Sequence, residues 1–375
     1  MQSLTKLPTL KGARVLVRVD YNVPLKGTKI LDTRRIDASV ATIRAIIKKG
    51  GTPVLLAHLG KGDESLRPVA TYLSKTFNTV FVTNDLYDPR TLDILDQVPK
   101  AAVVLIENIR RYKEEEENNA AFAKTLSRLG SYYVNDAFSV SHRAHASVVG
   151  IPKYLPSFAG IQLIAEIKAL SAATTNTKHP FVFILGGAKF GTKIPLLKQF
   201  ESRADKLIVG GAILNNFYKV AGFEVGDSVV EEGYDSAIKK LLKSPKLLLP
   251  VDVIVTRAAK KLVVTPTDVM PGDIIVDIGP QSVALIAAEL NRAKLVVWNG
   301  PVGWYEKKFD TGTIGIAKAI VTSKTHAIIG GGDTGAVIEK LIDGSDTKRI
   351  FVSTGGGAAL DYLATGTLPG IKALR

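Results

Sequence analysis

The chain contains no cysteine among its 375 residues, so disulfides, thiol nucleophiles and sulfur-bound metals are excluded. A lack of cysteine suits the reducing cytoplasm, where we expect the protein to work. Long apolar runs are also missing, and none reaches the length of a membrane span. Lys6 and Lys11 fall where a secretion signal would need its apolar segment. We therefore expect a cytoplasmic protein with no membrane partner.

Acidic residues are too few to balance the basic ones, and the formal net charge is +14. The basic excess extends through both halves of the chain. Nucleic-acid-binding proteins usually gather such charge on one face or in one tail, so we expect no nucleic-acid partner. A small anionic substrate accounts for part of the excess.

Short apolar runs alternate with helical patterns along the whole chain, which is typical of α/β proteins. The length suffices for two hydrophobic cores. A helical pattern opening at Pro156 ends in the polar stretch 174–178, which resembles a domain junction. A second alternating series follows and includes strands expected at 251–255 and 262–264. We predict two doubly wound, Rossmann-like α/β domains with parallel sheets, joined by a helix at 157–174.

Three glycine-rich loops, each directly after an apolar run, occupy the C-terminal part of the chain. They span residues 299–303, 330–334 and 353–357. Glycine lets backbone N–H groups approach an anion, and a following helix adds its positive N-terminal end. Three such loops in succession predict a sheet edge that holds a polyphosphate.

Two other nucleotide-binding patterns fit this sequence poorly. Residues 330–335 satisfy the dinucleotide pattern G-x-G-x-x-G, but the next strand ends at Ser353, without the acidic residue that would bind a ribose. The loop with Lys189 and Lys193 lacks the Gly-Lys-Ser/Thr of a Walker A motif. We therefore disfavour a nicotinamide-dependent dehydrogenase and a P-loop enzyme.

Basic and polar residues recur at the predicted strand ends of the N-terminal half. They lie in the segments 18–24, 34–36, 58–61, 107–110, 135–138 and 142–145. Arginine presents a planar fork that matches carboxylate and phosphate oxygens. Because strand ends of a parallel sheet meet at one edge, we expect a cleft for a compact polyanion there.

Taken in order, these motifs resemble those of the phosphoglycerate kinase family over essentially the whole chain. The matching segments are 18–24, 107–110, 135–138, 142–145, 186–189, 298–303, 330–334, 353–357 and 368–370. The resemblance implies an enzyme of glycolysis and gluconeogenesis that transfers a phosphoryl group reversibly between 1,3-bisphosphoglycerate and ADP. The products are 3-phosphoglycerate and ATP, and Mg²⁺ accompanies the nucleotide. It further implies a monomer with hinge bending.

The resemblance also assigns the parts of the chain. Residues 1–156 would bind the phosphoglycerate, 175–359 the nucleotide, and 360–375 would return to the first domain. Catalytic roles fall to Arg35, Lys193, Gly332 and Gly355. The phosphoglycerate-binding residues would be Asp20, Tyr21, Asn22, Arg35, His58, Leu59, Gly60, Lys61, Arg110, His142 and Arg143. The nucleotide-binding residues would be Gly187, Ala188, Lys189, Lys193, Gly211, Gly279, Asn299, Gly300, Pro301, Val302, Glu306, Gly331, Gly332, Asp333 and Thr334. Asp333 would hold the metal.

One loop departs from the family pattern. The family usually has His-Leu-Gly-Arg-Pro, whereas this chain has Lys61-Gly62 at the last two positions. Lysine keeps the charge but loses the bidentate fork, and glycine loosens the loop. A kinase for another small carboxylate therefore stays open, as does a nucleotide-binding sensor or scaffold without catalysis. We expect both Trp298 and Trp304 to pack rather than to stack on a base.

Overall fold

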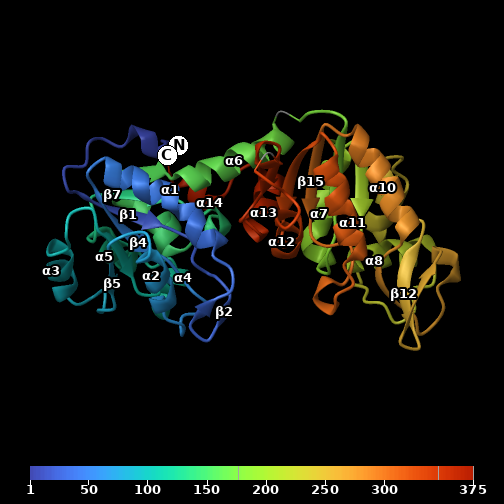
Figure 1. Cartoon of the computed structure of the whole chain (residues 1–375), viewed down its shortest axis with the longest axis horizontal. Coiled ribbons are helices and arrows are strands. Elements are labelled where there is room, and N and C mark those ends of the chain that lie inside the picture. The colour runs from blue at the N-terminus through green and yellow to red at the C-terminus, as the bar shows by residue number, and fades with distance from the viewer. Residues whose placement is uncertain (176, 345, 375) are drawn as a thin grey trace. The chain divides into compact units, whose positions relative to one another are not determined.

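The computed structural model describes residues 1–175, 177–344 and 346–374, so Asn176 in the predicted junction and Arg375 at the end of the predicted returning segment lie outside it. The chain forms two compact units, Met1–Lys168 with Thr367–Arg375 and Ala169–Gly366. Each has its own parallel sheet with helices around it, as Figure 1 shows. The prediction of a doubly wound α/β fold is confirmed.

The N-terminal unit is built on a six-stranded parallel sheet with the order β5-β6-β4-β1-β7-β8. Its strands are β1 (Arg14–Arg18), β4 (Thr52–Leu56), β5 (Thr79–Val82), β6 (Val103–Ile106), β7 (Tyr132–Asn135) and β8 (Ser157–Ala159). The short strands β2 (Leu25–Lys26) and β3 (Lys29–Ile30) form a separate hairpin. Val15, Leu16 and Val17 of β1 are fully buried, as expected for a strand covered on both faces.

Helices flank this sheet (Figure 1). They are α1 (Arg34–Lys48), α2 (Arg67–Leu73), α3 (Arg90–Asp96), α4 (Lys113–Glu116), α5 (Ala120–Ser127) and α14 (Pro369–Lys372). In α1 the residues Ile36, Ile43 and Ile46, at helical spacing, are all fully buried.

The main sheet of the C-terminal unit has the order β11-β10-β9-β15-β16-β17. Its strands are β9 (Phe181–Leu185), β10 (Lys206–Val209), β11 (Leu247–Leu248), β15 (Leu295–Asn299), β16 (His326–Gly330) and β17 (Ile350–Val352). The helices are α7 (Phe190–Glu201), α8 (Ala212–Ala221), α9 (Asp235–Leu242), α10 (Pro280–Arg292), α11 (Thr311–Thr322), α12 (Gly332–Glu339) and α13 (Gly357–Thr365). None of the helices in the described part of the chain combines the length and apolar character that a membrane crossing requires.

A second sheet in this unit differs from the expected parallel series. The strands β12 (Val253–Arg257), β13 (Lys260–Val264) and β14 (Ile274–Ile278) pair antiparallel in the order β13-β12-β14 (Figure 1). The connection between β12 and β13 is only a tight turn at Ala258 and Ala259, which both have positive φ. Such a short turn can join only antiparallel strands.

Two element boundaries near the junction also differ from the prediction. Helix α6 (Ile161–Thr174) begins at Ile161 because Ser157–Ala159 pairs with β7 as strand β8. The chain rejoins the N-terminal unit at Thr367, later than the predicted residue 360, because the intervening residues belong to α13, which packs on α7. The Gly370 N–H then donates to the Ser141 carbonyl at 2.8 Å.

Candidate active site

A cavity of about 700 Å³ opens in the C-terminal unit beyond the carboxyl ends of β9, β15 and β16. Most of the predicted nucleotide-binding residues line it. They are Gly187, Ala188, Lys189, Lys193, Gly211, Asn299, Gly300, Pro301, Val302, Glu306, Gly331, Gly332 and Asp333. This is the edge where ligands bind in open parallel sheets.

Helix N-termini converge on this cavity. The N-terminal residues of α8, α12 and α13 line it, and Gly211, Gly331 and Gly356 cap these helices at φ values of 59°, 94° and 49°. L side chains rarely adopt this backbone region, so glycine is required there. The helix N-termini direct partial positive charge and free N–H groups at the cavity, as an anion requires.

Lys193 is a half-buried cation of the cavity. Its Nζ donates to the Gly186 carbonyl at 2.5 Å. A Cβ on Gly187 would lie 2.6 Å from Nζ, and one on Gly300 would lie 2.9 Å from it, so both glycines make room for the ammonium. Burial lowers the pKa of Lys193 to about 8, because the charged form is poorly solvated. A phosphate oxygen beside Nζ would stabilise the charged ammonium, which burial has deprived of water.

Asp333, the predicted metal ligand, lines the cavity from the first turn of α12. Burial raises its pKa, and the nearby charge of Glu306 raises it further. Two carboxylates that repel each other beside a phosphate-binding loop would be stabilised by a bound cation, and Mg²⁺ prefers such oxygen ligands. The residues present therefore fit a magnesium ion carried with the nucleotide.

Three residues that the resemblance assigned to the nucleotide or to the transferring group do not line the cavity. They are Gly279, Thr334 and Gly355. A Cβ on Gly279 would meet the Asp252 carboxylate, and the Thr334 hydroxyl donates to the Gly330 carbonyl at 2.5 Å. The Gly355 N–H donates to Ser353 Oγ at 3.0 Å and would have to leave that bond to reach a transferring group.

An apolar part of the lining was missed in the sequence. It includes Leu214, Val229, Ile274, Ile275, Val276, Trp304 and Leu360. No alternation in the sequence marks this wall, because Ile274, Ile275 and Val276 of β14 line the cavity consecutively. Trp298 is fully buried as predicted, but the prediction that Trp304 packs is wrong, because it is 42% exposed and lines the cavity.

In the N-terminal unit, four arginines surround one buried histidine. The pKa of His58 is strongly lowered by burial and then by the charges of Arg18, Arg110, Arg143 and Arg35. Arg18 Nη2 lies 3.1 Å from His58 Nδ1. Arg18, His58 and Arg110 come from the ends of β1, β4 and β6, which are neighbours in the sheet, or from the segments that follow them. Arg143 comes from the loop after β7, and Arg35 from the first turn of α1. Several cations gathered at one edge of the sheet favour the binding of a polyanion.

Arg18 is the functional candidate that the sequence did not single out. It is fully buried, and its Nε donates to Ser147 Oγ at 2.8 Å. Ser147 in turn donates to the buried Glu115 carboxylate at 2.5 Å. Arg18 stands at the end of β1, in the motif at 18–24 that the sequence predicted to converge with 58–61, but the motif did not indicate that its side chain would be buried against His58.

Arg35 lies on the first turn of α1, and its side chain is oriented by residues of the loop after β1. Its Nη1 lies 3.0 Å from Asp20 Oδ2 and donates to the Asn22 carbonyl at 3.0 Å. Asp20 also accepts a hydrogen bond from Ser139. The carboxylate thus holds the guanidinium in place.

The remaining predicted residues differ in accessibility. Tyr21 and Leu59 are buried in the core, and the Tyr21 hydroxyl pairs with Ser39 Oγ at 2.9 Å, so neither side chain faces a ligand. Arg143 and Lys61 are exposed. Arg143 Nε lies 3.4 Å from His142 Nε2. Gly60 is held by Asn22, whose Oδ1 accepts its N–H at 3.0 Å.

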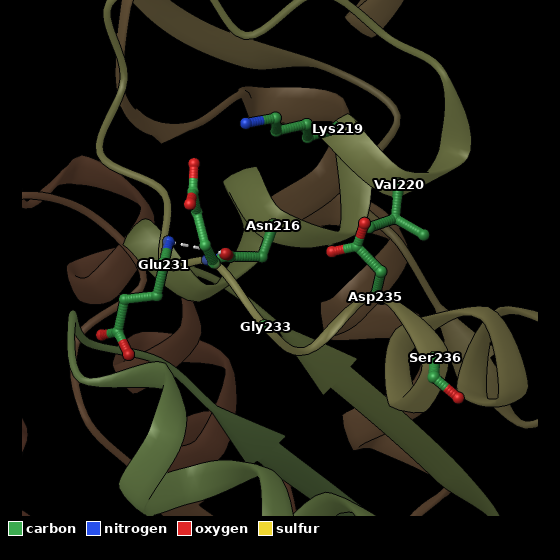
Figure 2. A pocket seen from close by; sticks show the side chains of 8 residues that line it. Asn216, Lys219, Val220, Glu231, Gly233, Asp235 and Ser236 are labelled. Atoms are coloured by element: carbon green, nitrogen blue, oxygen red, sulfur yellow. Dashed lines mark hydrogen bonds between the residues drawn. The ribbon is translucent and has the colours of Figure 1, made fainter.

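A second hollow of about 460 Å³ lies between α8 and the start of α9, and Figure 2 shows its lining. It contains none of the predicted residues. There the Glu231 N–H donates to Asn216 Oδ1 at 2.8 Å. The Glu231 carboxylate instead accepts the N–H groups of Phe190 and Gly191 at 2.8 and 3.0 Å, and so caps α7.

The fold and the two sites define a phosphotransferase class: an anion site in one α/β unit and a nucleotide-type cavity in the other. Comparison with known proteins gives the family. The phosphoglycerate kinase family model matches residues 4–366. A phosphoglycerate kinase of Dictyoglomus turgidum is 40% identical over 98% of this chain and 96% of its own. The cytosolic phosphoglycerate kinase of Nicotiana tabacum is 40% identical over 97% of this chain and 96% of its own.

A solved structure agrees with these sequences. The phosphoglycerate kinase of Coxiella burnetii superimposes with a TM-score of 0.84 at 38% identity, covering 99% of this chain and 97% of that one. The chain belongs to the phosphoglycerate kinase family, and it is an enzyme that transfers a phosphoryl group with a carboxyl group as acceptor.

Proposed function

We propose that the N-terminal arginine cluster binds 3-phosphoglycerate or 1,3-bisphosphoglycerate and that the C-terminal cavity binds ADP or ATP. The observation that carries this proposal is the gathering of four arginines near His58, because several cations at one sheet edge favour a ligand with several negative charges. Arg110 and Arg143 would contact its phosphate and carboxylate. Asp20 and Asn22 would bind the hydroxyl of the glycerate.

The chemistry requires positioning and charge cancellation rather than a base. The acceptor is a carboxylate that is already ionised at neutral pH, so no proton has to be removed. Transfer breaks the bond between the γ-phosphorus of ATP and its bridging oxygen and forms a bond from phosphorus to a carboxylate oxygen. Arg35 and Lys193 would stabilise the charge in transit. The Gly332 N–H would serve likewise, and the Gly355 N–H only after leaving its bond to Ser353 Oγ.

The metal would be held by Asp333 and would neutralise the nucleotide phosphates when bound. We also infer that the protein acts in the cytoplasm as a monomer and that its two units close during the reaction. The two half-sites belong to different units, so transfer requires that they meet. Closure would also exclude water, to which an acyl phosphate is vulnerable.

The test is coupled turnover of 3-phosphoglycerate with MgATP in the wild type, Arg35→Ala and Asp333→Asn. We expect robust wild-type activity and a loss of at least about 100-fold in kcat for each variant, the size seen when one charge-stabilising group is removed. An inactive wild type that still binds MgATP would contradict the proposal. Turnover of another carboxylate would then favour a different substrate, and no turnover would favour a sensor.

A further inference from the structure

The loop at residues 60–62, where this chain has Lys61-Gly62 in place of the family's Arg-Pro, follows an unusual backbone path. Gly62 has a φ of +126°. Proline is fixed near a φ of about −65°, so it cannot occupy this conformation. Other L residues rarely adopt it. The loop therefore follows a path that the family's proline would not permit.

Gly62 also brings the loop unusually close to the Arg110 backbone. A Cβ at position 62 would lie 2.6 Å from the Arg110 carbonyl oxygen and 3.0 Å from its carbonyl carbon. A backbone carbonyl cannot rotate away as the end of a side chain can. Any residue larger than glycine would therefore push the loop and Arg110 apart.

The same loop also binds the Arg110 side chain, through the carbonyl of Gly60. Arg110 Nη1 donates to the Gly60 carbonyl at 2.8 Å, and Nε lies 3.2 Å from Glu116 Oε1. The side chain is only 9% exposed. Its Nη2 is buried and has no hydrogen-bond partner in the described part of the chain. A buried donor of this kind requires an acceptor, and a phosphate or carboxylate oxygen would supply it.

Asn108 forms hydrogen bonds both to the loop that contains Gly62 and to the backbone of Arg110. It is 1% exposed, its Nδ2 donates to the Leu59 carbonyl at 2.7 Å, and its Oδ1 accepts the Arg110 N–H at 3.2 Å. The loop and Arg110 thus form one packed arrangement. Gly62 lies where this arrangement brings the loop against the Arg110 backbone.

We propose that Gly62 is a positioning residue for the phosphoglycerate site. Its positive φ and missing side chain let the loop close on Arg110, so that the Gly60 carbonyl fixes the guanidinium with Nη2 free for the ligand. This arrangement compensates for Lys61, which has the charge of arginine without its fork. The inference rests on the proposed assignment of Arg110 to 3-phosphoglycerate.

The test is steady-state kinetics of Gly62→Ala, with Gly12→Ala as the matched control. Gly12 also has a positive φ, +86°, but a Cβ there would meet nothing within 4 Å. It precedes β1, at the amino edge of the sheet, whereas the predicted site is at the carboxyl edge. We expect Gly62→Ala to raise the KM for 3-phosphoglycerate roughly tenfold, since small displacements of binding groups weaken a site by such factors. The KM for MgATP should stay unchanged, and Gly12→Ala should change neither constant.

A second variant tests the loop path directly. Lys61→Arg combined with Gly62→Pro restores the family's residue pair, and we expect it to bind 3-phosphoglycerate more weakly than the wild type. A variant that folds only in the cold is assayed there beside the wild type, because KM does not depend on the amount of folded enzyme.

The outcomes separate the two proposals. Unchanged KM values in Gly62→Ala, or tighter binding by the Arg-Pro variant, would overturn the role of Gly62 while leaving the function intact. A wild type that does not turn over 3-phosphoglycerate would overturn the proposed function instead. An equal rise in both KM values would indicate a general structural defect and would also refute a positioning role.

Discussion

The half-buried ammonium of Lys193 is positioned by glycine as much as by its own helix. Gly187 and Gly300 leave space for Nζ, and the Gly186 carbonyl accepts its proton. With a pKa lowered to about 8, the group is only partly charged in mildly alkaline solution. A bound phosphate would favour the charged form and raise this pKa.

Nucleotide affinity should therefore depend on pH through Lys193. Below about pH 8 the ammonium is already present, so affinity should be constant. Above that value the free enzyme must first take up a proton, and affinity should fall about tenfold per pH unit. Lys193→Arg keeps its charge and should remove this decline. Calorimetric titration of MgADP between about pH 7 and 10 measures it.

Lys198→Arg is the matched control, since Lys198 is exposed on the same helix. This variant should keep the wild-type pH profile. A wild-type affinity that stays constant up to pH 10 would refute the role of Lys193.

Single side chains were the least predictable part of the sites. Lys189 and Lys193 line the cavity as the motif implied, because glycine loops fix the backbone around them. Tyr21 also lies in a family motif, the segment 18–24, but its side chain faces the core. Trp304 lines the cavity instead of packing in the core. Which way a side chain points depends on its neighbours across the sheet, and a motif does not contain that information.

At the scale of elements, the parallel sheets were predictable because buried parallel strands are continuous apolar runs. Pairing partners were not. β12 and β13 have apolar residues like the strands of the main sheet, yet they form an antiparallel sheet with β14. The deciding feature was the short turn between them.

Helix α6 begins at a buried carboxylate. Asp136 Oδ1 accepts the N–H groups of Gln162 and Leu163 at 2.9 and 3.2 Å and so caps this helix. Asp136 is 4% exposed, and burial raises its pKa to about 7. The same carboxyl in the unfolded chain has a pKa near 3.8.

Asp136 should make the protein less stable as pH rises. The folded state keeps its proton up to about pH 7, whereas the unfolded state loses it near 3.8. Stability from this group is therefore greatest at low pH and is lost as pH rises between these values. Asp136→Asn keeps the Oδ1 acceptor and cannot titrate. Between about pH 5 and 8, the wild type should lose about 2 kcal/mol of unfolding free energy relative to Asp136→Asn.

Urea unfolding of both proteins across this range is the measurement, with Asp63→Asn, on an exposed loop residue, as control. Parallel curves for the wild type and Asp136→Asn would mean that the carboxyl is ionised at the helix start throughout. That result would contradict a raised pKa.

At the scale of the whole molecule, the two predicted sites lie in different units, and the C-terminal segment of the chain returns to the N-terminal unit. Thr367 and the residues after it rejoin the N-terminal unit, where Leu368 and Leu374 are buried. The polypeptide therefore links the units twice, through α6 and through the segment after α13. Two connections allow a hinge while limiting the directions in which it bends.

Closure should require both ligands together. If each ligand binds to one unit, as proposed, then neither ligand alone stabilises a closed state. With 3-phosphoglycerate and a non-transferable MgATP analogue both bound, the charge of each ligand can be met by groups of both units. We expect the radius of gyration in small-angle X-ray scattering to fall only in this ternary state. Arg35→Ala, which removes a cation from the phosphoglycerate site, should keep the larger radius, whereas Lys198→Arg should behave as the wild type. An identical radius in all ligand states would show that transfer occurs without the hinge motion inferred above.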